Sequence, residues 1–137
     1  MALIMRSKPV QPSGFAESPA TFDLKDNRVS TNALNALSRH GYSEDEIFAL
    51  VVPKRTLARR KAAKEPLTIE ETDKALRLER IASQAERVFG APEKAHRWLR
   101  KPKRALRGET PVAYLATEAG ARLVEEMLVR IEHGMFA

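Results

Sequence analysis

The chain of 137 residues contains no cysteine. This absence excludes disulfide frameworks, thiolate metal sites and cysteine nucleophiles. The first five residues are briefly apolar, but no apolar core of signal-peptide length follows, and no stretch approaches the roughly 20 apolar residues that span a bilayer. We therefore expect a soluble cytoplasmic protein that makes no membrane contact.

Residues that commonly carry enzyme chemistry are also scarce. There are three histidines, His40, His96 and His133, and none forms a recognisable catalytic sequence pattern with a base or carboxylate partner. The chain has neither a phosphate-cradling glycine loop nor the His-Glu-x-x-His spacing of a zinc site. We expect no enzyme activity, no catalytic residue, no metal site and no cofactor.

The residues that are abundant favour helices. Aromatic residues make up 6% of the chain, whereas Ala, Leu, Glu, Lys and Arg are frequent. The length suits one ordinary domain or two small ones that share a core. The sequence therefore predicts an all-α fold.

Positive charge is concentrated in two segments. Residues 54–64 carry six Lys and Arg and no acid, residues 94–108 carry seven and no acid, and the remainder of the chain sums to −7 against a total of +6. This distribution indicates two surfaces for anionic partners, or one for nucleic acid and one for a protein.

Helix signals in the first half describe a helix-turn-helix over residues 29–66. Residues 1–28, rich in Pro, Gly and Ser, are expected to form a flexible arm. A helix over 31–39 is stopped by Gly41, and a capping box at Ser43–Glu46 opens a second helix that ends before Pro53. A sharp turn and a third, arginine-rich helix from Lys54 follow.

The second half is divided into a long helix and a small helical region. A second capping box, Thr68 with Glu71, opens a helix that Gly90 ends, and residues 67–90 are expected to connect the domains or dimerise. Residues 91–137 are expected to hold a helix from Pro92, a basic loop, a short helix and a last helix that Gly134 ends.

The arginine-rich helix has the composition of a DNA reader. Helical periodicity turns Leu57 inward and Arg55, Thr56, Arg59 and Arg60 outward. Guanidinium groups can bind guanine, and a Thr methyl can contact thymine, whereas marginal lysines meet phosphates more readily. The candidate DNA-binding residues are Lys54, Arg55, Thr56, Arg59, Arg60 and Lys61. The alternative, a solvated surface helix, stays open.

The chain from about residue 40 to its end resembles the Xre/MbcA/ParS antitoxin family, specifically the Xre antitoxins paired with RES-domain toxins. The resemblance rests on short motifs in matching order, which include Leu57-Ala-Arg-Arg-Lys61, Val88-Phe-Gly90, Gly108-x-Thr-Pro111, Leu115-x-Thr-Glu-x-Gly-Ala121 and Arg130-Ile-x-x-Gly134. Two positions depart from the family pattern, which often has Asn at Lys103 and Gly at Arg107.

The resemblance implies a dimeric antitoxin of a type II toxin-antitoxin system. Such a protein has an Xre/Cro-like helix-turn-helix followed by a small toxin-binding domain, here residues 91–137. It would neutralise a RES toxin that depletes NAD and, in complex with it, repress its own operon at operator DNA. The resemblance implies that toxin contact falls to the end of the chain, at Arg130, His133, Gly134, Met135, Phe136 and Ala137.

Two questions stay open at the level of sequence. Met135 and Phe136 follow a helix stop, so they either fold back on the last helix or fill a partner's pocket. The helix-turn-helix also fits a stand-alone transcriptional regulator that binds no toxin. Trp98 is expected to belong to the core of the C-terminal region, and Gly120 is expected to permit a close helix crossing.

Overall fold

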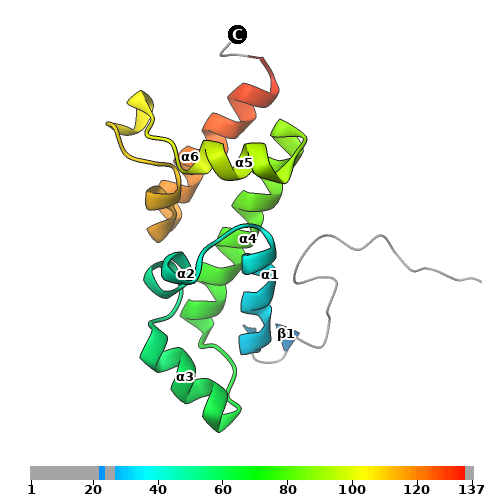
Figure 1. The fold of residues 1–137 in the computed structure, drawn as a ribbon, viewed down its shortest axis with the longest axis vertical. Coiled ribbons are helices and arrows are strands. Elements are labelled where there is room, and N and C mark those ends of the chain that lie inside the picture. The colour runs from blue at the N-terminus through cyan, green and yellow to red at the C-terminus, as the bar shows by residue number, and fades with distance from the viewer. Residues whose placement is uncertain (1–21, 24–26, 135–137) are drawn as a thin grey trace, which may run out of the picture.

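A computed structural model describes residues 22–23 and 27–134. Within these ranges the regular secondary structure is helical apart from two short antiparallel strands, β1 (Phe22–Asp23) and β2 (Arg28–Val29). The prediction of an all-α fold is confirmed. The longest helix, α4 (Ile69–Phe89), lies in the centre, and the other helices are arranged along its length (Figure 1).

The helical elements follow in this order: η4 (Thr31–Ala33), α1 (Leu34–Arg39), α2 (Glu44–Leu50), α3 (Lys54–Ala63), α4 (Ile69–Phe89), α5 (Pro92–Leu99), η5 (Arg104–Leu106), η6 (Val112–Ala116) and α6 (Glu118–Glu132). The elements labelled η are 3-10 helices.

Both predicted capping boxes are confirmed. The Ser43 hydroxyl accepts a hydrogen bond from the Glu46 amide at 3.1 Å, and the Glu46 carboxylate accepts one from the Ser43 amide at 3.0 Å. Thr68 and Glu71 make the same pair of bonds at the start of α4, at 3.1 and 2.9 Å. These reciprocal bonds satisfy amides that a helix start leaves free, so both helices begin where the sequence predicts.

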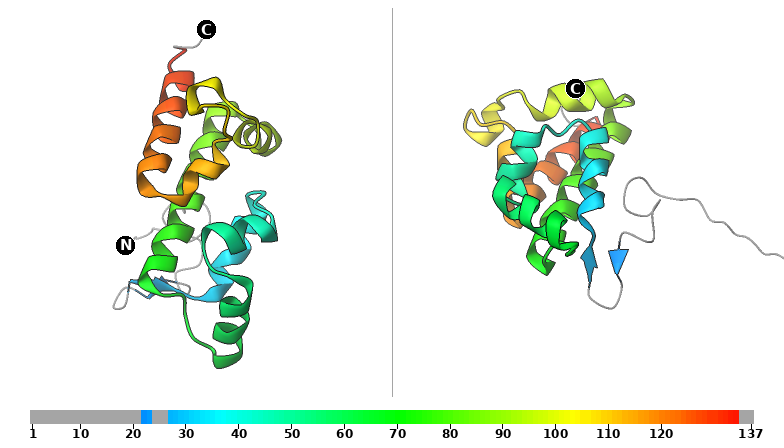
Figure 2. Two further views of the ribbon diagram at one scale, coloured as in Figure 1. Left: turned by 90° about the vertical axis from the view of Figure 1, so that its left-hand side faces the viewer. Right: turned by 60° about the horizontal axis from the view of Figure 1, so that its bottom comes forward.

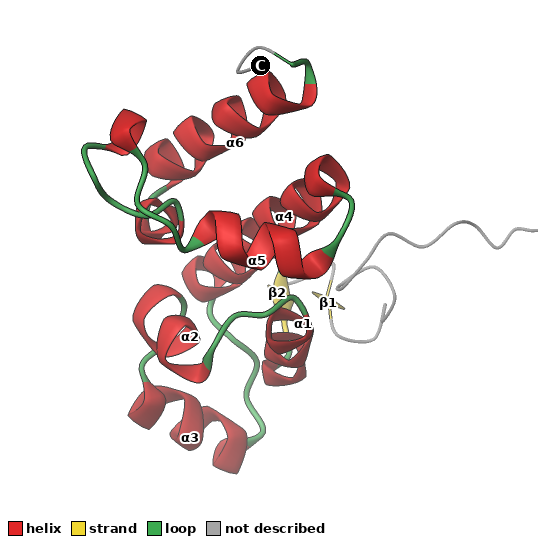
Figure 3. Ribbon diagram, turned by 45° about the horizontal axis from the view of Figure 1, so that its top comes forward, coloured by secondary structure: helices red, strands yellow, loops and turns green. Residues whose placement is uncertain are grey.

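The core is one continuous cluster arranged around α4. The predicted apolar face of α4 is buried at Leu78, Ile81, Ala82 and Ala85. The first half of α4 packs against α1, whereas α5 and α6 pack against it further along (Figures 2 and 3). The two halves of the molecule therefore share one helix.

The short hairpin brings part of the predicted N-terminal arm into the fold. The Arg28 guanidinium donates to the Leu67 carbonyl at 2.7 Å, and the Val29 amide donates to the buried hydroxyl of Thr72 at 3.1 Å. Residues 1–21 and 24–26 of that arm lie outside the described residues.

Two expectations for the C-terminal region are refined. Trp98 is half-buried at the edge of the core, with its ring 5.5 Å from that of Phe89 and the Lys103 ammonium 4.9 Å from its centroid. Gly120 is buried, and a Cβ there would overlap the carbonyl of Tyr114. Gly120 thus permits the close approach of α6 to the 3-10 helix η6 rather than a crossing of two α-helices.

Candidate functional site

The helix pair α2–α3 forms the predicted helix-turn-helix at one end of the molecule. Ile47 of α2 and Leu57 of α3 are buried in the common core, and Pro53 stands at the turn with an extended backbone before α3 begins. Because Leu57 anchors the inner side of α3, the rest of that helix lies on the surface (Figure 1).

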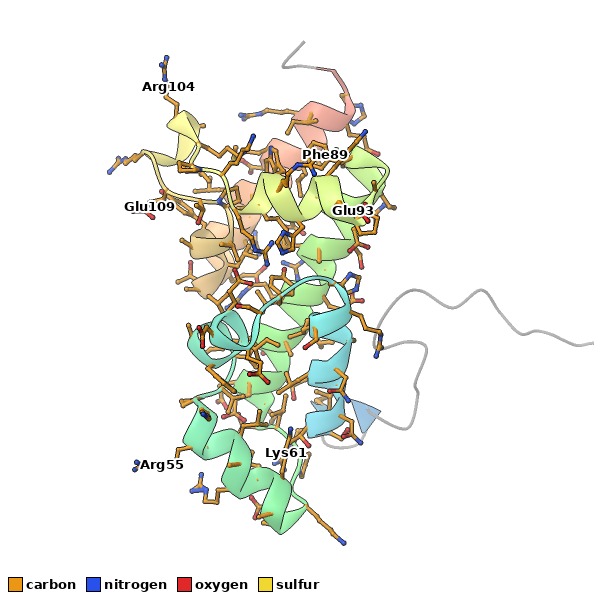
Figure 4. The ribbon with its side chains drawn as sticks, viewed as in Figure 1. Arg55, Lys61, Phe89, Glu93, Arg104 and Glu109 are labelled. Carbon is orange, nitrogen blue, oxygen red and sulfur yellow. The ribbon has the colours of Figure 1, made fainter. Side chains whose placement is uncertain are left out.

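The outer side of α3 carries most of the predicted DNA-binding residues. Lys54, Arg55, Arg59 and Lys61 are exposed, and Thr56 is half-buried. Within the described part of the chain none of these four cations forms an ion pair, and Figure 4 shows Arg55 extending away from the body. Their charges are therefore available to an anionic partner.

The prediction that Arg60 faces outward is wrong. Its Nη2 donates to Glu71 Oε2 at 3.1 Å, and its Nε lies 3.1 Å from Oε1 without the alignment of a hydrogen bond. Both side chains are 13% exposed. Arg60 lies at the margin of the helix that Leu57 anchors, so its long side chain can reach back to the first turn of α4. It ties α3 to α4 and is withdrawn from the DNA-binding set.

The opposite end of the molecule carries the residues expected to contact a toxin. Arg130 and His133 are exposed at the end of α6, and Gly134 ends that helix with a φ of 75°. Met135, Phe136 and Ala137 lie outside the described residues.

The loop after α5 contains a left-handed residue. Arg107 has a φ of 58°, a conformation that costs a side chain roughly 1 kcal/mol and that glycine adopts freely. This geometry would suit a glycine at position 107, the residue that the family resemblance leads us to expect there. Two bonds hold the turn closed: Gly108 N donates to Lys103 O at 2.9 Å and Lys103 N to Glu109 O at 3.0 Å.

An arginine joins the two halves of the molecule. Arg100, which follows α5, donates to both carboxylate oxygens of Glu46 at 3.1 and 2.7 Å and to the Gly41 carbonyl at 3.1 Å. Its guanidinium also lies 5.6 Å from the centroid of the Tyr42 ring. Sequence reasoning missed this contact because Arg100 and Glu46 are 54 residues apart.

His40 has two carboxylate partners that the sequence analysis did not find. Its Nε2 lies 2.8 Å from Glu79 Oε2, and its Nδ1 lies 2.8 Å from Glu86 Oε2. The bond to Glu79 raises the pKa of His40 most; burial lowers it, and the bond to Glu86 raises it again, to about 9. A signal existed in the sequence, because Glu79 lies among the apolar residues of α4 and Glu86 follows two turns later.

The described residues hold no group of three or more His, Cys, Asp or Glu placed to bind a metal ion. Among the helices of the described ranges, none is both long and apolar enough to cross a membrane.

Two family models match the chain, one in its N-terminal half and one in its C-terminal half. Residues 25–80 match the Antitoxin Xre-like helix-turn-helix domain, and residues 84–134 match the Antitoxin Xre/MbcA/ParS C-terminal toxin-binding domain. The matched ranges meet within α4, the helix that both halves share.

Both halves of the chain are thus similar to Xre antitoxins.

Curated relatives show the same similarity. Antitoxin Xre of Pseudomonas putida is 45% identical over 84 residues, which cover 61% of this chain and 53% of the relative. Antitoxin Xre of Yersinia enterocolitica is 34% identical over 63% of this chain and 59% of its own length. The Prs ADP-ribosylating antitoxin of a Sphingobium species is 33% identical over 65% of this chain and 62% of its own length. The chain therefore spans about half to three fifths of the length of these relatives.

Proposed function

We propose that this chain is an Xre-type antitoxin of a type II toxin-antitoxin system. Its C-terminal domain binds and neutralises a cognate RES-domain toxin that consumes NAD. Its helix-turn-helix binds operator DNA and represses its own operon. It does so as a homodimer that assembles with the toxin into a larger complex.

One observation carries the proposal: the domain named for toxin binding and the exposed cations of the helix-turn-helix lie at opposite ends of the molecule. α3 is at one end and the close of α6 at the other in both views (Figures 1 and 2). This separation lets one molecule hold DNA and a protein at the same time.

The kind of toxin is inferred from the sequence motifs and from the name of one relative. The motifs resemble antitoxins paired with RES-domain toxins, and one relative carries the words ADP-ribosylating in its name. ADP-ribosyl groups are taken from NAD, so this name fits a partner that acts on NAD. The role in neutralisation proposed for Arg130, His133 and Gly134, and for residues 135–137, follows from the same resemblance.

Coexpression with the product of the neighbouring gene tests this function. We expect the two proteins to copurify as a stable complex whose mass gives the stoichiometry. The toxin alone should lower cellular NAD, and coexpression of this chain should restore it. A chain that binds operator DNA but leaves the neighbouring protein unbound would instead be a stand-alone regulator.

A further inference from the structure

We propose that the cationic α5–η5 face is a second protein-binding surface, one that attracts an acidic surface of the partner toxin. This face is defined by five exposed cations on α5 and in the loop around η5, namely Lys94, Arg97, Lys101, Arg104 and Arg107. The inference rests on the proposed function, since it assigns a surface to the same partner.

The first argument is that these five charges have no partner within the described residues. Three arginines packed between elements are paired by contrast: Arg60 with Glu71, Arg80 with Glu125 and Arg100 with Glu46. The cations of the α5–η5 face form no such pair, although acids are frequent elsewhere in the chain. Their charge therefore adds up to a local positive field rather than being neutralised in place.

The second argument is that the loop is held in one shape. Lys103 lies over the Trp98 ring, and burial lowers the pKa of Lys103, with Lys101 nearby as the lesser cause. The Lys103–Gly108 and Lys103–Glu109 backbone bonds close the turn on which Arg104 and Arg107 stand. A surface whose backbone is already ordered loses less entropy on binding.

The third argument concerns which anion fits. Lys94, Arg97 and Lys101 lie within eight residues of helix and turn, which span about 10 Å along the axis. This length exceeds one phosphate group and fits an extended acidic surface. Figure 4 places Arg104 at the far end of the molecule from Arg55, so DNA bound to α3 would not reach this face of the same chain. A protein partner is therefore favoured over the operator.

The test compares two triple variants with the same loss of charge. In one, Arg97, Lys101 and Arg104 are replaced by Gln; in the matched control, Lys54, Arg55 and Arg59 of α3 are replaced by Gln. All six residues are exposed, so both variants should unfold at the temperature of the unmodified chain. The association rate with the purified neighbouring gene product is then measured at low and at moderate salt.

We expect the α5–η5 variant to associate about tenfold more slowly at low salt and to lose most of its salt dependence. The α3 control should stay within about twofold of the unmodified chain. Equal association rates for the two variants would overturn the proposal while leaving the proposed function intact. Loss of operator binding by the α5–η5 variant, with unchanged toxin association, would assign the face to nucleic acid. If the unmodified chain does not bind the toxin, the proposed function itself fails.

Discussion

At the scale of single residues, His40 shows how the fold sets the charge of a side chain. Two carboxylates of α4 hold the imidazole from both ring nitrogens, and Glu79 is itself buried. The pKa of His40 rises from 6.5 to about 9 as a result, so the folded protein binds this proton more tightly than the unfolded chain.

This difference predicts a loss of stability at alkaline pH. The contribution of His40 to the unfolding free energy is complete below pH 6.5 and is lost as the pH rises through about 9. Relative to a His40→Gln variant, the unmodified chain should lose on the order of 2 to 3 kcal/mol over that window. Denaturant titrations from pH 6 to 9.5 measure the difference, and a constant gap between the two proteins would contradict the prediction.

Gly120 makes a second prediction at this scale. Replacing glycine by alanine within a helix ordinarily stabilises it by about 1 kcal/mol. At Gly120 the added Cβ would overlap the Tyr114 carbonyl, which is backbone and cannot swing away. We therefore expect Gly120→Ala to lower the unfolding free energy by about 1 to 3 kcal/mol. Ala119 is the exposed neighbour of Gly120 in α6, so Ala119→Gly serves as a control that measures the helix-propensity effect alone. A Gly120→Ala protein that is more stable than the unmodified chain would refute the close approach.

At the scale of elements, α3 combines two different kinds of arginine. Arg55 and Arg59 are exposed and unpaired within the described residues, whereas Arg60 is half-buried and paired with Glu71. Replacing Arg55 and Arg59 together by Ala should abolish operator binding at physiological salt and leave the thermal midpoint unchanged. Gel-shift titration and thermal unfolding check the two halves of this prediction.

Arg60→Ala, in the same helix, is the variant to compare with the Arg55→Ala, Arg59→Ala double variant. It should destabilise the protein by about 1 to 3 kcal/mol, because Glu71 would lose its partner in a poorly hydrated place while still capping α4. A variant that keeps full stability but loses DNA binding would return Arg60 to the DNA-binding set.

The contact between α5 and α2 is the other element-scale test. Arg100 and Glu46 are about one fifth exposed, and the same carboxylate caps α2. We expect Arg100→Ala and Glu46→Ala each to cost about 1 to 3 kcal/mol, and the double variant to cost less than their sum. A double-mutant cycle by denaturant unfolding measures the coupling, and strictly additive losses would show that the pair contributes nothing beyond its separate contacts.

At the scale of the whole molecule, the two ends should be separable by mutation. Deleting residues 134–137 should remove protection against the toxin but keep operator binding, because α3 lies at the other end of the molecule (Figure 1). The Arg55→Ala, Arg59→Ala variant should behave in the opposite way. Growth rescue and gel-shift assays on both variants test this; continued protection by the shortened chain would move neutralisation to another surface, such as the α5–η5 face.

The sequence by itself determined the local features of this protein. Side chains three residues apart set both capping boxes, and a 3.6-residue period marked the buried face of α4 and the inward Leu57. The order of these signals was enough to predict an all-α fold and a helix-turn-helix. Such features depend on neighbours along the chain, so they can be read without knowing how the helices pack.

Only the tertiary structure decided which charged side chains are free. Arg60, Arg100 and His40 look like ordinary surface residues in the sequence, yet they pair with acids 11, 54 and 39 residues away. Arg97 and Arg104 have similar sequence surroundings and no such partner among the described residues. Ion pairs form between groups that packing brings together, and long side chains can reach inward from the margin of a helix. The positions available to DNA or to a protein partner therefore follow from the packing around α4.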